Sequence, residues 1–115
     1  MTLLLSLVLT VGGTYLDGHA ILKSSAPANG GSVTGPDVPV KLMFNVRVDA
    51  ARSRLQLLMP DASTVELSVI KWPSPDTLVA KLTGVKPGAY AIRWQVLAPD
   101  GHISRGEIPF TVRNP

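Results

Sequence analysis

The chain has 115 residues, which is enough for one small domain with a modest hydrophobic core. Cysteine is absent, so disulfide bonds and metal sites built on thiolates are both excluded. The formal net charge is only +3, and Lys and Arg are scattered rather than concentrated in a stripe, so we expect no nucleic-acid partner.

The N-terminal stretch, residues 3–16, is apolar and contains no charged side chain. It is too short to cross a bilayer comfortably, but it matches the apolar part of a secretory signal. Cleavage after Gly18 would make His19 the first mature residue, whereas cleavage after Gly13 satisfies the small-residue preference better. A retained N-terminal helix is the alternative. We expect residues 1–18 to be a secretory signal and residues 19–115 to be the exported domain, in a bacterial periplasm.

Alternating apolar and polar residues predict a series of short strands in the rest of the chain, separated by Pro and Gly turn signals. The predicted strands cover residues 20–25, 38–46, 55–59, 65–69, 78–82, 89–97 and 108–112. Residues 31–37 are expected to be a loop, and residues 49–52 a single helical turn. This pattern predicts an all-β fold, a seven-stranded antiparallel Greek-key sandwich of the immunoglobulin-like type.

An Asp-Gly-His triplet lies between the last two predicted strands and places Asp100 and His102 two residues apart. Asp-Gly is a common hairpin turn, so a plain turn is the simpler explanation of the triplet alone. The one other histidine, His19, also ends an Asp-Gly-His triplet and stands just before the first predicted strand. If His19 meets the later triplet, two imidazoles and a carboxylate favour Cu(II), although zinc is chemically possible.

Other candidate residues carry weaker signals. Met59 is expected in the core and Met43 outward and alone, so a Cu(I) site built on thioethers is not favoured. Ser104 lies near His102, but no third member of a nucleophilic triad is evident. Trp72 is expected to be a loop aromatic that covers an edge of the sandwich.

Three stretches resemble the CopC family of periplasmic copper-binding proteins, the copper-resistance proteins of the CopC/PcoC type. Residues 19–30 look like the family's mature N-terminus, which opens with histidine, and residues 40–44 resemble its second strand. The third stretch is similar to the family's most specific signature. It contains Tyr90, Trp94, Val96, Asp100, Gly101, His102, Gly106, Phe110 and Val112.

The resemblance implies an immunoglobulin-like or cupredoxin-like sandwich with a Cu(II) site formed by His19, its terminal amine included, together with Asp100 and His102. It implies a monomeric carrier for copper homeostasis or resistance, not an enzyme. A CopD-type inner-membrane protein is the implied partner, on a separate chain. The methionine-rich Cu(I) loop of some members is not present. Where many members have an acidic residue after the second-strand phenylalanine, this chain has Asn45.

Two other functions stay open at this point. A histidine chelate at the N-terminus plus a second histidine is also the ligand core of copper monooxygenases that cleave polysaccharides. Those enzymes keep an open coordination position, which Asp100 would fill here. The remaining alternative is a metal-free adhesion or accessory sandwich, in which the triplet at residues 100–102 is only a turn.

Overall fold

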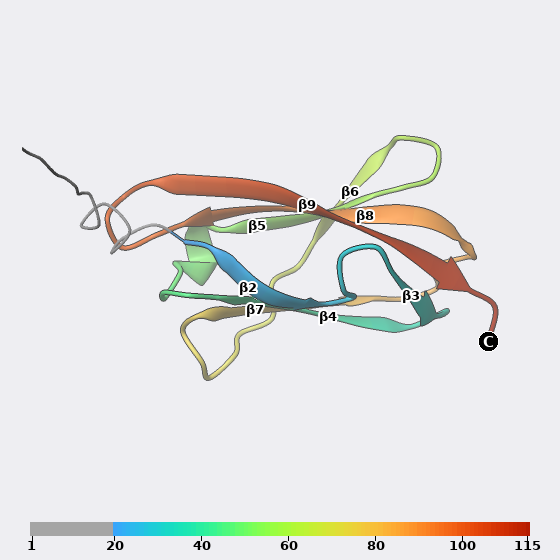
Figure 1. The fold of residues 1–115 in the computed structure, drawn as a ribbon, viewed down its shortest axis with the longest axis horizontal. Helices are drawn as coiled ribbons and strands as arrows, with labels where there is room; N and C mark the ends of the chain where they lie inside the picture. Colours follow the sequence, from blue (N-terminus) through green and yellow to red (C-terminus); the bar gives the residue numbers. More distant parts are fainter. Residues whose placement is uncertain (1–19) are drawn as a thin grey trace, which may run out of the picture.

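The computed structural model describes residues 20–115, which form two β-sheets (Figure 1). The predictions for the signal segment and for His19 fall outside the described residues. One sheet has three strands in the order β2-β4-β7, and the other has five in the order β3-β9-β8-β5-β6. The strands are β2 (Leu22–Ala26), β3 (Gly31–Thr34), β4 (Val38–Phe44), β5 (Arg54–Leu58), β6 (Thr64–Leu67), β7 (Thr77–Leu82), β8 (Gly88–Leu97) and β9 (Ile103–Arg113).

The core lies between the two sheets, as the alternating pattern predicts. Leu42 and Leu78 of the three-stranded sheet are 0% exposed, as are Leu55 and Ile92 of the five-stranded sheet. Because alternate residues of a strand point to opposite faces, each sheet contributes one apolar face to this core. The all-β sandwich is therefore confirmed, and so is the short helical turn, which is a 3-10 helix at Ala50–Arg52.

Two details of the predicted fold are wrong. Residues 31–34, expected to be a loop, form β3, so residues 20–115 contain eight strands rather than seven. β3 runs parallel to β9, so the five-stranded sheet is mixed rather than wholly antiparallel. The sequence Gly-Ser-Val-Thr has no apolar alternation, and the strand exists because β9 extends far enough to pair with it. The Greek-key description stays a prediction.

The β8–β9 hairpin is the longest ladder in the described part of the chain and runs from the pair Gly88 and Val112 to the pair Leu97 and Ile103. Its loop, residues 98–102, carries the Asp-Gly-His triplet. The Ala98 N–H donates to the His102 carbonyl and the Gly101 N–H donates to the Ala98 carbonyl, both at 3.0 Å. The hairpin thus presents the triplet at one end of the sandwich.

Candidate metal centre

The candidate centre is organised by the side chain of Asp100. The His102 N–H donates to Asp100 Oδ1 at 2.9 Å, which closes a local turn of the kind that Asp and Asn make with the residue two positions on. Gly101 between them has a φ of +86°, a left-handed conformation that favours glycine. The order Asp-Gly-His therefore sets the backbone of the loop by itself.

The same carboxylate also contacts the imidazole. Asp100 Oδ2 lies 2.8 Å from His102 Nδ1, and the two side chains are 27% and 65% exposed. A carboxylate oxygen accepts a hydrogen bond, so in the neutral ring it places the proton on Nδ1 and leaves the lone pair on Nε2. Carboxylates orient metal-binding histidines in this way in many proteins. The contact thus favours the tautomer with its lone pair on Nε2, in a ring that is exposed at the tip of the hairpin.

The start of β2 is fixed near this loop by the segment that follows β4. The Ile21 N–H donates to Asn45 Oδ1 at 2.7 Å, and the Asn45 N–H donates to the Ile21 carbonyl at 3.0 Å. Four residues later, the Asp49 N–H donates to the Leu97 carbonyl at 3.0 Å. Residues 45–49 thus join the beginning of β2 to the end of β8. Figure 1 shows the first residues of β2 at the same end of the sandwich as the β8–β9 loop.

The structure therefore brings together Asp100 and His102, while His19 lies outside the described residues. Within residues 20–115, no group of three His, Cys, Asp or Glu side chains could hold a metal ion. Ala20, the residue after His19, is 5% exposed and packs in the core. The prediction that His19 completes the site stays a prediction. The part that sequence reasoning missed is Asn45, whose amide oxygen holds the chain two residues beyond His19.

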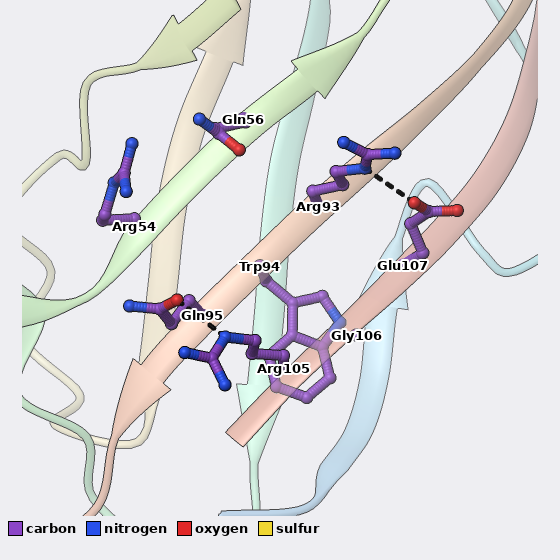
Figure 2. A pocket seen from close by; sticks show the side chains of 8 residues that line it. All are labelled: Arg54, Gln56, Arg93, Trp94, Gln95, Arg105, Gly106 and Glu107. Carbon is purple, nitrogen blue, oxygen red and sulfur yellow. Dashed lines mark hydrogen bonds and ion pairs between the residues drawn. The ribbon is translucent and has the colours of Figure 1, made fainter. Parts of the chain in front are cut away.

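A separate hollow of about 470 Å³ lies on the outward face of the five-stranded sheet (Figure 2). Its polar side chains pair with one another across the strands. Arg93 Nε lies 2.7 Å from Glu107 Oε2, and Arg105 Nε donates to Gln95 Oε1 at 2.9 Å. The hollow contains no histidine and is formed by β5, β8 and β9 rather than by the 98–102 loop. We assign it a structural role as a cross-strand network of polar side chains.

The edge of this network contains a second ion pair, between Arg54 and Glu66. Arg54 Nη2 lies 2.9 Å from Glu66 Oε1, and this hydrogen bond holds the pKa of Glu66 below its ordinary value. A lowered carboxyl pKa stabilises the fold above the unfolded pKa, and that stabilisation is lost as the pH falls through the folded pKa. Because both side chains are more than half exposed, the effect on stability is small.

Replacing Arg54 by leucine is therefore expected to raise the pKa of Glu66 toward its ordinary value. NMR titration of the carboxyl groups measures the shift directly. Arg93→Leu is the matched control, because Arg93 pairs with Glu107 instead and should leave Glu66 unchanged. If the titration midpoint of Glu66 is the same in the Arg54 variant, the guanidinium is not what lowers the pKa of this carboxyl group.

Three comparisons relate the chain to known proteins. A family model described as the CopC domain matches residues 22–113. The crystal structure of CopC from Methylosinus trichosporium OB3b superimposes with a TM-score of 0.77 at 28% identity, covering 84% of this chain and 95% of that one. PcoC, described as a methionine-rich copper resistance protein from Escherichia coli, gives 0.70 at 26% identity, covering 83% and 99%. Protein YobA of Escherichia coli strain K12 is 28% identical over 98 residues, which are 83% of this chain and 79% of YobA.

Proposed function

The chain belongs to the CopC domain family, and from this premise we propose that it is a periplasmic Cu(II)-binding carrier for copper homeostasis or resistance. PcoC, whose description states a role, is a copper resistance protein, and a role of that kind, rather than catalysis, is what we propose for this chain. The observation that carries the proposal is the contact between Asp100 and His102 at the exposed hairpin tip. It orients the imidazole for a metal without burying it.

The proposed ligands are His102 through Nε2, Asp100 through a carboxylate oxygen, and His19. In the structure Asp100 Oδ2 faces Nδ1, on the side of the ring away from Nε2, so the carboxylate would turn from the ring to share an ion with His102. Nitrogen and oxygen donors without sulfur suit Cu(II) in tetragonal geometry, and copper exceeds zinc in affinity for such sites. If His19 begins the mature chain, its amine and ring nitrogen chelate the same ion.

The proposal is tested on the protein as it is exported. Mass spectrometry of that protein gives its first residue and so decides whether His19 carries a free amine. Cu(II) titration followed by electron paramagnetic resonance should then give one tetragonal centre with nitrogen and oxygen ligands. Failure to bind Cu(II) more tightly than micromolar would favour the metal-free accessory sandwich instead.

The cellular setting is part of the same proposal. Residues 1–18 would be removed on export, and the domain would act as a monomer in the periplasm, delivering copper to a CopD-type inner-membrane protein or acting with it. Between residues 20 and 115 the structure has no helix long and apolar enough to span a bilayer. Fractionation of cells that express the full chain tests the location, and crosslinking to a CopD-type protein tests the partner.

Asn45 should support copper binding without touching the ion. Asn45→Ala removes the acceptor for the Ile21 N–H, so the segment that carries His19 loses one of its two anchors. We expect Cu(II) affinity to fall about tenfold, as for other groups that orient a ligand. A competition titration with a coloured chelator measures it.

Two variants serve as controls for Asn45. Asn45→Asp keeps an oxygen acceptor at the same place and should restore most of the affinity. Asn29→Ala makes the same chemical change in the exposed turn beyond the other end of β2 and should have no effect. Equal affinities for the wild type and Asn45→Ala would mean that the start of β2 does not need this anchor.

A further inference from the structure

A second surface, distinct from the loop at residues 98–102, covers the outward side of the three-stranded sheet. It consists of the exposed side chains of β2, β4, β7 and the adjoining segment 68–73, and we call it the lysine face. Across these four segments there are four lysines and neither Asp nor Glu. The lysines are Lys23, Lys41, Lys71 and Lys81.

The strand register places apolar side chains among these lysines. Lys41 pairs with Ala26 on one side and Val79 on the other, so the three share one cross-strand row. Ile70 makes a single bridge to Val79 and extends the row beyond β7. Trp72 follows and lies against Lys41, whose Nζ is 5.3 Å from the indole centroid. Ile70 and Trp72 remain 42% and 43% exposed.

The opposite outward face has a different character. Figure 2 shows Arg93 paired with Glu107, and Arg54 pairs with Glu66, so two of the three arginine charges that line this face are matched by carboxylates. The four positive charges of the lysine face have no acidic side chain among its own segments. Asp37 and Asp76 stand just before β4 and β7, so the lysine face is basic between these ends. Four lysines around exposed Trp and Ile have the charge and polarity of a site for an anionic interface.

We propose that the lysine face docks the domain on a membrane surface containing anionic phospholipids. Tryptophan prefers the headgroup level, where its ring is in an apolar setting and its N–H in a polar one. Lysine is a point charge on a flexible stem, which suits laterally mobile phosphates, whereas arginine provides the rigid fork that suits fixed carboxylates. All the cationic side chains of this face are lysines, while the other face has Arg54, Arg93 and Arg105.

This docking is weak and reversible, because only two large apolar side chains are available and lysine contributions are screened by salt. It does not depend on copper binding or on any ligand of the proposed metal centre. Its role would be to keep the domain at the membrane. The two proposals can therefore fail separately.

The test is sedimentation of the purified chain with phosphatidylcholine vesicles, with and without phosphatidylglycerol, at low and high salt. We expect binding only with phosphatidylglycerol, and loss of that binding at high salt. Lys41→Gln and Lys71→Gln should each lower the partition coefficient about fivefold. Trp72→Ala should lower it as well, and should abolish the blue shift of tryptophan emission on binding.

The matched control removes two positive charges from the other sheet, by Arg54→Gln and Arg93→Gln, and should leave most of the binding. Every variant keeps the same N-terminus, so any contribution of the apolar residues 3–16 cancels in the comparison. An equal loss from the Lys41→Gln/Lys71→Gln double variant and from the arginine double variant would overturn the proposal, because it would show only an effect of net charge. Binding that ignores phosphatidylglycerol, or no binding at all, would also overturn it and leave an acidic protein as the partner to seek.

Discussion

Replacing His102 by alanine is expected to lower Cu(II) affinity by at least about a hundredfold while leaving the domain folded. Changes to groups that only orient a ligand already cost ten- to a hundredfold in metal affinity, and this change removes a proposed ligand itself. The side chain is 65% exposed, so its loss costs little stability. A chelator competition assay measures the affinity, and thermal unfolding followed by circular dichroism confirms the fold.

The neighbouring residue provides the control for His102. Ile103 is 50% exposed and also close to the loop, so Ile103→Ala perturbs the same hairpin without removing a donor atom. The Cu(II) affinity of the Ile103→Ala variant should match that of the wild type. If His102→Ala also binds Cu(II) as the wild type does, the triplet is only a turn and the metal proposal is lost.

A double-mutant cycle asks whether His19 and His102 hold the same ion. If both bind one Cu(II), the second substitution should cost much less than the first, because the site is already broken. Independent, additive losses would place the two imidazoles in separate sites. The experiment thus tests the part of the centre that lies before residue 20.

Most of the sandwich could be predicted because its strands alternate apolar and polar residues. Inward Leu42 and Ile92 lie where that pattern puts them. β3 was missed because its pairing partner, β9, is far away in the chain, and nothing local in its sequence requires a strand. β9 also begins earlier than predicted, since Ser104 and Gly106 interrupt the apolar pattern but pair with β8 all the same.

In the candidate site, too, the part set by local sequence could be predicted and the part set by long-range packing could not. Asp100 and His102 are two residues apart, so their turn depends on local sequence and could be predicted. Asn45 was seen only as the loss of an accessory carboxylate, because its bond to Ile21 spans 24 residues and depends on how the strands pack. The position of Trp72 against Lys41 likewise follows from β-sheet register, which the sequence of a single segment does not contain.

Adding one methyl group at Gly106 is expected to lower the free energy of unfolding by about 2–3 kcal/mol. Gly106 lies within β9, directly opposite Trp94 of β8, and the indole ring covers it. A Cβ there would lie 2.7 Å from Trp94 Nε1 and closer still to the outer ring of the indole. The ring is held on another side by Phe44, edge to face with centroids 5.3 Å apart. Since protein interiors are close-packed, the strain falls on both aromatic side chains.

Urea denaturation of Gly106→Ala measures this cost, and two comparisons identify its origin. Gly84→Ala adds a methyl group where no atom lies within 4 Å, so it should cost only the backbone strain of its φ of +66°, about 1 kcal/mol. Trp94→Phe removes the outer part of the indole, so Gly106→Ala should cost much less in that background. An undiminished cost there would mean that the backbone of β9, rather than the indole above it, requires glycine at this position.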